Sequence, residues 1–136
     1  MAGPSTAGLA ALNAGEDWHY VGEAGEPAFQ NSWANVSTTT KLAFRIREAG
    51  VVDIYGHVSG GTSAPATVVF TLPAGYRPSA EISTSIFGLA GSPATTAVPV
   101  LLTIATDGTV KPSGFSSNAT SIWINTQIFL APPVVA

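Results

Sequence analysis

Residues 41–58 read KLAFRIREAGVVDIYGHV and indicate the fold class of this chain. Apolar residues recur at alternate positions on both sides of a short break, as Leu42, Phe44, Ile46, Val52, Ile54 and Val58. A period of two places such side chains on one face of a strand, with the polar ones on the other. Glu48-Ala49-Gly50 supplies the turn, because glycine can take a positive φ. The stretch therefore predicts an antiparallel β-hairpin.

The rest of the chain continues this pattern. Further strand-like runs, separated by turns rich in Gly, Pro and Ser, lie at residues 67–72, 79–89, 98–106 and 121–130. Asp107-Gly108 predicts a two-residue hairpin turn. No stretch of useful length has the apolar spacing of a capped helix. Seven to nine short strands in one chain predict an all-β fold, an antiparallel β-sandwich of the jelly-roll type.

The composition points to a surface that is buried against other chains. Of 136 residues, 46% are hydrophobic and only 10% are charged, well below the usual ~25%. A domain of this length has a core of its own, yet much of its surface must be uncharged. A monomer with such a surface tends to associate. We therefore expect a symmetric oligomer that buries one repeated apolar patch.

The composition also argues against several classes of protein. Five basic residues and a net charge of -3 cannot neutralise a run of phosphates, so we expect no nucleic-acid partner. The absence of cysteine excludes disulfides, thiol catalysis and zinc–thiolate sites. The longest apolar run, residues 98–105, is only as long as a strand, so we expect no membrane insertion. The first residues lack the basic and apolar regions of a signal peptide.

The first fifteen residues differ from the rest of the chain. They are rich in Ala and Gly, and Leu9 and Leu12 are their only large side chains. Such a segment is either a flexible tail or an arm that becomes ordered when it docks on another chain. In the second interpretation, Leu9 and Leu12 are the anchor. We divide the chain into an arm, residues 1–15, and a β-sandwich domain, residues 16–136.

Several motifs, taken together, resemble a known group of viral domains. They are Trp33, residues 42–45, residues 50–58, residues 60–61, and the sequence FTLPAGYRP at residues 70–78. They resemble the trimeric β-sandwich domain common in bacteriophage tail-fibre, baseplate and head-fibre proteins. In that group, a strand of the form G-x-V-x-l-x-G-x-v precedes an LP-x-G-y-R-P corner, and an Asp-Gly-Thr hairpin follows later. The resemblance spans Trp18 to Leu130, and its most specific part is Leu72 to Pro78.

This resemblance implies a homotrimer and a structural role in a phage virion. The chain would be assembled in the host cytoplasm and would dock on other virion proteins. Its place would be that of a capsid decoration protein, a head fibre, or a tail-fibre or baseplate component. The alternative is a module of a phage fibre that binds a host receptor or cell-surface glycan. In that case the loops at residues 59–66 and 91–97 would carry recognition.

The corner at residues 72–78 has a physical explanation of its own. Pro73 ends the strand because it has no N–H to donate, Gly75 supplies a positive φ, and Pro78 stiffens the exit. Tyr76 offers a large ring with a polar tip that can reach backbone. Arg77 can hold carbonyls or a carboxylate at a seam between subunits. A rigid corner without a ligand is the simpler interpretation.

The sequence contains no constellation typical of an enzyme. Asp53 and His57 share a strand face, but four positions on a strand span ~13 Å, too far for direct pairing. No Gly-x-Ser-x-Gly elbow is present. We therefore expect no catalytic residue and no cofactor. Three copies of His57 on a trimer axis could bind a metal. We prefer a partly buried histidine bonded to backbone or carboxylate, and no metal.

The aromatic residues remain as site candidates. Those that could stack on a sugar are Trp18, Tyr20, Phe29, Trp33, Tyr55, Tyr76 and Trp123. The alternative is packing in the core or at a seam. It is favoured for Trp123, because its neighbours Ile122 and Ile124 face the other way and the strand is then apolar on both faces. The candidate interface and structural residues are Trp18, Trp33, Phe70, Tyr76, Arg77 and Trp123.

Overall fold

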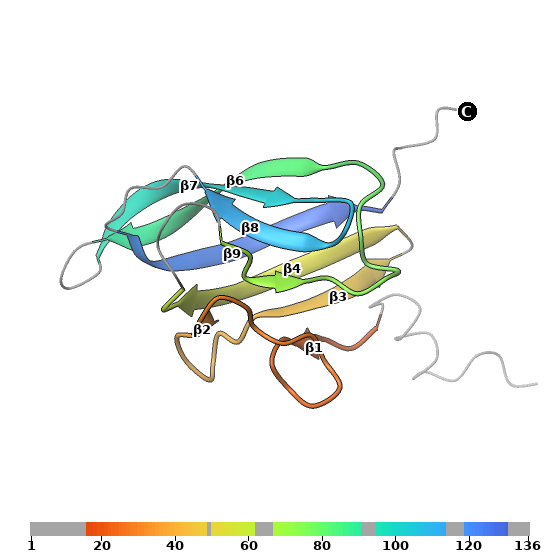
Figure 1. The fold of residues 1–136 in the computed structure, drawn as a ribbon, viewed down its shortest axis with the longest axis horizontal. Helices are drawn as coiled ribbons and strands as arrows, with labels where there is room; N and C mark the ends of the chain where they lie inside the picture. Colours follow the sequence, from red (N-terminus) through yellow and green to blue (C-terminus); the bar gives the residue numbers. More distant parts are fainter. Residues whose placement is uncertain (1–15, 49, 62–66, 91–94, 114–118, 131–136) are drawn as a thin grey trace, which may run out of the picture.

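The computed structural model describes residues 16–48, 50–61, 67–90, 95–113 and 119–130. Within these ranges the chain forms β-strands and no helix, so no helix that could cross a membrane is present there (Figure 1). The strands are β1 (His19–Tyr20), β2 (Ala34–Asn35), β3 (Ala43–Glu48), β4 (Val51–Ser59), β5 (Phe70–Thr71), β6 (Ile82–Ala90), β7 (Thr96–Ile104), β8 (Thr109–Ser113) and β9 (Ala119–Phe129).

All these strands belong to one antiparallel sheet. Its order is β1-β3-β4-β9-β6-β7-β8-β5, and β2 pairs with β4 beside this path. The sheet curls into a half-barrel, so its two ends face each other across the core (Figure 1). The rings of Phe44 on β3 and Phe70 on β5 stack there, with centroids 5.8 Å apart. The predicted all-β antiparallel fold is confirmed, whereas the jelly-roll sandwich and the trimer stay predictions.

The β3–β4 hairpin forms where the alternating pattern placed it. Phe44 pairs with Ile54 across the two strands, and both side chains are buried. Gly50 has a φ of 82°, as the turn requires. Gly56 on β4 faces the core, where an added Cβ would lie 2.3 Å from the Cα of Leu42. The hairpin therefore needs glycine at two positions, one for backbone conformation and one for space.

Two local predictions differ from the structure. The strand predicted at residues 67–72 is reduced to β5, because the ladder to β8 is regular only at residues 70–71. The predicted two-residue turn at Asp107-Gly108 is one residue longer. The Ala105 N–H donates to the Thr109 carbonyl, and Gly108 has a φ of 90°. Asp107 accepts a bond from the Thr109 N–H, which favours this wider loop.

Residues 16–35, called the N-terminal segment from here on, fasten both ends of the sheet. On one side, the Val21 N–H donates to the Leu42 carbonyl just before β3. On the other side, the Gln30 N–H donates to the Val69 carbonyl just before β5. Trp33, at 6% exposure, closes the segment against the core. The segment therefore covers sheet edges whose unpaired backbone groups would otherwise invite other chains.

Candidate functional site

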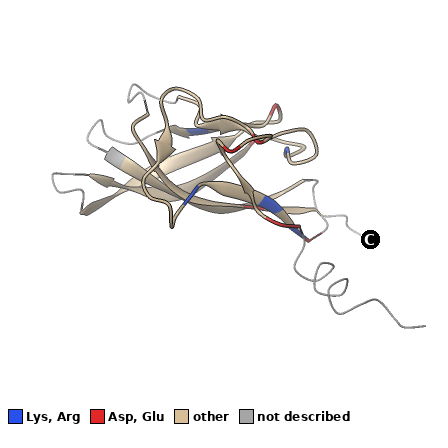
Figure 2. Ribbon diagram, turned by 90° about the horizontal axis from the view of Figure 1, so that it is seen from below, with Lys and Arg blue, Asp and Glu red and all other residues tan. Residues whose placement is uncertain are grey.

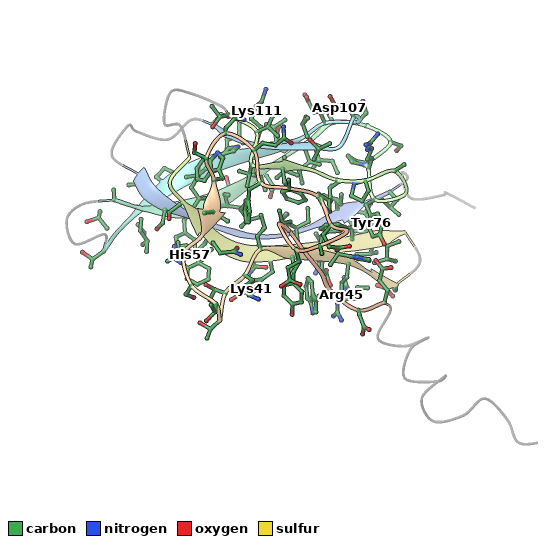
Figure 3. The ribbon with its side chains drawn as sticks, turned by 60° about the horizontal axis from the view of Figure 1, so that its bottom comes forward. Lys41, Arg45, His57, Tyr76, Asp107 and Lys111 are labelled. Atoms are coloured by element: carbon green, nitrogen blue, oxygen red, sulfur yellow. The ribbon has the colours of Figure 1, made fainter. Side chains whose placement is uncertain are left out.

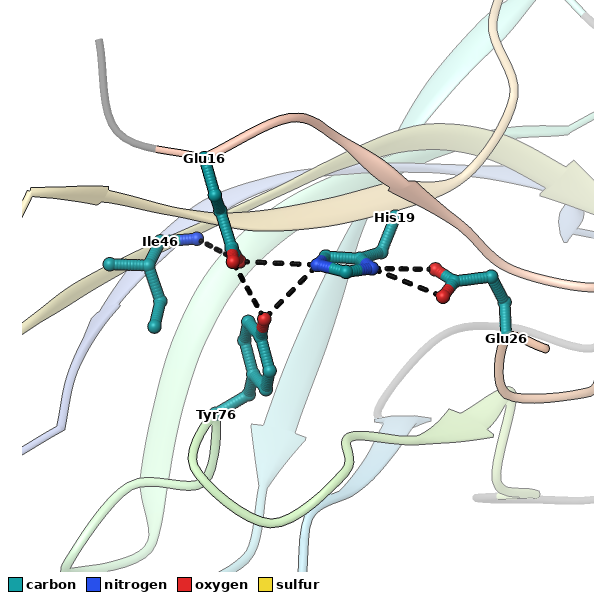
Figure 4. Close-up of polar contacts among 5 residues, drawn as sticks. All are labelled: Glu16, His19, Glu26, Ile46 and Tyr76. Carbon is teal, nitrogen blue, oxygen red and sulfur yellow. Dashed lines mark hydrogen bonds and ion pairs between the residues drawn. The ribbon is translucent and has the colours of Figure 1, made fainter. Parts of the chain in front are cut away.

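A polar network around His19 holds the N-terminal segment against the rest of the fold (Figure 4). The Nδ1 atom of His19 lies 2.8 Å from Oε2 of Glu26. Its Nε2 atom lies 3.0 Å from the hydroxyl of Tyr76 and 3.4 Å from Oε1 of Glu16. The Tyr76 hydroxyl donates to Oε2 of Glu16 at 2.9 Å. These contacts, which we call the His19 network, therefore join the N-terminal segment to the corner at residues 72–78.

The geometry favours the charged form of His19. Nδ1 faces a carboxylate and must carry a proton to donate. With a second proton on Nε2, the ring donates to the Tyr76 oxygen, and Tyr76 in turn donates to Glu16. Burial lowers the pKa of His19, but the hydrogen bonds to Glu26 and Glu16 outweigh it and raise that pKa. Burial and the Glu16 hydrogen bond raise the pKa of Tyr76 to about 12.

Glu16 connects this network to the sheet. Its Oε1 atom accepts from the Ile46 N–H at 2.9 Å, and its own N–H donates to the Ile46 carbonyl at 3.1 Å. Burial raises the pKa of Glu16, but hydrogen bonds from Tyr76, Ile46 and His19 outweigh it and lower that pKa. The His19 ring also stacks on Phe44, with centroids 5.2 Å apart. Together these contacts fix β1 on β3.

The corner at residues 72–78 has the predicted positive φ at its glycine and one further internal contact. Gly75 has a φ of 94°. Arg77 donates through Nε to the Leu72 carbonyl at 2.8 Å, so it holds a carbonyl of its own chain. The hydroxyl of Tyr76 reaches Glu16 and His19 rather than backbone. Sequence analysis missed these partners because they lie 57 and 60 positions away and no local pattern links them.

A groove lined by aromatic residues lies beside this network. Trp18 and Tyr20 flank His19 in sequence, and alternation along the chain turns them to the opposite side. Two hollows meet there, and both are lined by Trp18 and Tyr55. The larger, of about 530 Å³, is also lined by Tyr20, Thr38, Thr39, Lys41 and Ala43. The smaller, of about 320 Å³, is also lined by Arg47, Asp53, Ile54, Asn125, Thr126 and Gln127. We call these residues the aromatic groove.

The cations along the groove are held by carboxylates of the same chain. Arg47 Nε lies 3.1 Å from Oδ2 of Asp53. Arg45 lies over the ring of Trp18, 4.5 Å from its centroid, and its Nε is 3.8 Å from the same Asp53 oxygen. Figure 3 shows Arg45 and Lys41 along one side of the sheet, away from Asp107 and Lys111.

Lys41 has a carboxylate partner of its own. Its Nζ lies 3.1 Å from Oε1 of Glu23 and 5.6 Å from the ring centroid of Tyr20. Arg45 and Arg47 share Asp53, and Arg47 Nη1 also lies 3.1 Å from Oε1 of Glu48, so three cations face three carboxylates. The groove is therefore nearly neutral.

The outer face of β6, β7 and β9 has a different character. These three strands contain no charged residue, and Figure 2 shows them without blue or red. Ile122 is buried, whereas Trp123 lies half-buried on the opposite face, as predicted. Phe87, opposite Trp123 on β6, is 46% exposed. We call this surface the uncharged face.

His57 lies at the border of the uncharged face. Its ring stacks on Trp123, with centroids 4.1 Å apart and planes 7° from parallel. Burial lowers the pKa of His57. Its buried Nε2 has no hydrogen-bond partner within the described part of the chain. Where we expected a bond to backbone or carboxylate, the structure thus shows packing against an indole.

The other site candidates fall into two groups. Trp33 and Phe70 belong to the core of the chain itself. The arm with Leu9 and Leu12, and most of the two loops proposed for recognition, lie outside the described residues. Within the described ranges no group of three or more His, Asp or Glu side chains is arranged to hold a metal ion. The aromatic groove is therefore the candidate site that the structure adds to the prediction.

Comparison with known proteins bears on the fold. No protein-family model matches the sequence, and no curated protein sequence does. The crystal structure of the receptor binding protein (gp15) of Listeria phage PSA matches with a TM-score of 0.61. The match covers 88% of this chain and 69% of that chain, at 16% sequence identity. The chain has a fold similar to that of a phage receptor-binding protein. This likeness establishes the fold alone.

Proposed function

We propose that this chain is a component of a bacteriophage virion that acts as a fibre or receptor-binding module. The observation that carries the proposal is the fold similarity to a phage receptor-binding protein over 88% of the chain. The corner at residues 72–78, which resembles phage fibre domains, supports it independently. The aromatic groove supplies a surface that a host receptor could occupy. The proposal involves no catalytic step, cofactor or metal.

A homotrimer that docks on other virion proteins is the finer part of this proposal. The uncharged face supports it, because an exposed sheet face with Phe87 and Leu101 and without charge is suited to burial against protein. Closed cyclic symmetry would bury one such patch on every copy. The finer proposal also includes the jelly-roll type of β-sandwich that we expect for the chain within this trimer. Attachment through Leu9 and Leu12 remains the proposed role of the arm.

The test of the receptor-binding role uses intact host cells. The purified, fluorescently labelled chain is incubated with bacteria that the corresponding phage infects, and with bacteria that resist its adsorption. We expect saturable binding to the sensitive cells alone, together with competition against phage adsorption. Binding that is equal on both kinds of cell, or absent from both, contradicts the receptor-binding role.

The test of the oligomeric state uses light scattering during size-exclusion chromatography. We expect a particle of three times the chain mass, and we expect Phe87→Lys to shift it toward the monomer, because a cation on the uncharged face must be desolvated on assembly. Thr106→Lys, at an exposed loop position outside β6, β7 and β9, is the matched control. A stable monomer at micromolar concentration contradicts the trimer and leaves the receptor test unaffected.

A further inference from the structure

We infer that the aromatic groove binds a neutral oligosaccharide, in contact with Trp18 and Tyr55. The inference names the receptor chemistry for the proposed function and rests on that function for its biological meaning. Its support is the shape, the ring faces, the polar groups and the charge of the groove.

The shape of the groove fits an extended ligand. Its two hollows, of about 530 and 320 Å³, fall within the ~300–1,000 Å³ typical of small-ligand sites. They share Trp18 and Tyr55 as a common wall, so a ligand can pass from one hollow to the other along these two rings. A chain of at least two sugar rings suits this arrangement better than a single compact molecule.

The ring faces in the groove suit sugars. Tyr20 and Tyr55 are 37% and 38% exposed, so both rings are accessible from the groove. The electron-rich face of an aromatic ring attracts the weakly positive C–H groups on one face of a pyranose. Arg45 packs on Trp18 and the His19 network fixes the strand between Trp18 and Tyr20, so these rings are held in place before any ligand binds.

The polar groups of the groove can form the hydrogen bonds that sugar hydroxyls need. Thr38 and Thr39 line the larger hollow with hydroxyl groups. Asn125 and Gln127 line the smaller one with planar amides, which can donate to one sugar hydroxyl and accept from its neighbour. Apolar rings with a few convergent hydrogen-bonding groups fix both the plane and the orientation of a sugar.

The charge of the groove favours a neutral ligand over an anionic polymer. Lys41 is paired with Glu23, and Arg47 is paired with Asp53. A phosphate or carboxylate entering the groove would have to compete with these carboxylates or lie beside them. No cation that lines the groove is free of an anionic partner, so the site offers hydrogen bonds rather than net positive charge.

The test uses the full chain on a printed array of neutral hexose and N-acetylhexosamine oligosaccharides, with sialylated and phosphorylated members as the anionic arm. Bound members are then titrated by calorimetry against the chain and its variants. We expect neutral members to bind, and Trp18→Ala and Tyr55→Ala each to weaken binding about tenfold or more. Phe87→Ala, an exposed ring that lines neither hollow, is the matched control and should bind unchanged.

Several outcomes would overturn the inference. They are binding of anionic members alone, binding of no member, and neutral binding that Trp18→Ala and Tyr55→Ala leave unchanged. Thermal unfolding of each variant verifies that it is folded, and Tyr55→Phe, which keeps the ring, should retain binding. If host cells bind the chain equally with and without Trp18, the inference fails while the proposed function stands. If sugars bind in the groove and no host cell does, the proposed function fails instead.

Discussion

Two sides of the molecule differ in how their polar groups are paired: the side that carries the His19 network and the aromatic groove, called the His19 side, and the uncharged face. Every ion pair within the described ranges involves residues between positions 16 and 53. The strands β6, β7 and β9 carry none, and their outer surface presents rings and small polar groups. One side is held together by paired charges from distant segments, whereas the other relies on apolar packing beneath it.

This difference distinguishes side chains that hold the fold together from side chains that are exposed and could contact a partner. The ion pairs on the His19 side form within the chain, where they hold the N-terminal segment in place and border the aromatic groove. On the uncharged face, Phe87 and Leu101 are 46% and 42% exposed, which is why we propose this face for burial against other protein.

The largest expected difference is between two phenylalanines. Phe44, 1% exposed, packs on His19, Phe70 and Tyr76, so Phe44→Ala should lower the free energy of unfolding by about 3–5 kcal/mol. Phe87→Ala on the uncharged face should change it by less than about 0.5 kcal/mol in the monomer. Chemical denaturation measures both. Equal losses would mean that the uncharged face is not exposed in the isolated chain.

The next difference is between two tyrosines. Tyr76→Phe removes the hydroxyl that lies between Glu16 and His19, and should cost about 1–3 kcal/mol because both partners lose a hydrogen bond. Tyr55→Phe removes an exposed hydroxyl and should cost almost nothing. Denaturation midpoints at pH 6 compare the two. A Tyr76→Phe variant as stable as the wild type would show that the network does not hold the N-terminal segment.

The two histidines should give opposite pH dependences. The raised pKa of His19 makes its contribution complete below the usual value of 6.5, and that contribution is lost as the pH rises through the folded-state pKa. The pKa of His57 is lowered, so its neutral folded form gains stability as the pH rises toward 6.5.

The corresponding variants separate these effects. We expect His19→Gln to remove the fall in stability above about pH 6.5, and His57→Gln to remove the rise below it. Unfolding free energies at several pH values between about 5 and 8 measure both slopes. The lowered pKa of Glu16 adds a separate loss as the pH falls below its usual value of 4.5. If both variants keep the wild-type profile, neither histidine is coupled to folding.

The smallest expected effect concerns an exposed pair on the His19 side. Lys41 and Glu23 are close but largely solvated, so Glu23→Gln should change the free energy of unfolding by less than about 0.5 kcal/mol. Glu26→Gln, which removes the carboxylate beside Nδ1 of His19, should cost distinctly more. Each variant removes one negative charge. A larger loss for Glu26→Gln, measured by denaturation, would show that the burial of a carboxylate determines its contribution to stability on this side.

Alternation at period two predicted the strands and the β3–β4 hairpin well, because these depend on local geometry. The hairpin formed by β3 and β4, its buried residues and the turn at Gly50 all follow from positions within a few residues of each other. The same is true of the opposite orientations of Ile122 and Trp123. The Asp107-Gly108 pair alone predicts a two-residue turn. The structure has a wider one, because the side chain of Asp107 accepts a hydrogen bond from the Thr109 N–H.

The candidate site could not be predicted because it is made by contacts between distant residues. Trp18 and Tyr55 were recognised as possible sugar-stacking residues, yet nothing in the sequence places them beside each other or beside Asn125. The hydrogen bond from Tyr76 to Glu16 crosses 60 positions. Curling of the sheet brings these segments together, and that curvature depends on packing across the core rather than on any local pattern.

The fastening of both sheet ends by the N-terminal segment has a consequence for how the chain matures on the ribosome. Gln30 is synthesised well before its partner Val69, and β4 must wait until β9 has been made. Such long-range pairing is slow, and the waiting strand edges are open to other nascent chains. The half-barrel therefore closes only after β9 has been made, and the N-terminal segment, synthesised before all its partners, is among the last parts to settle.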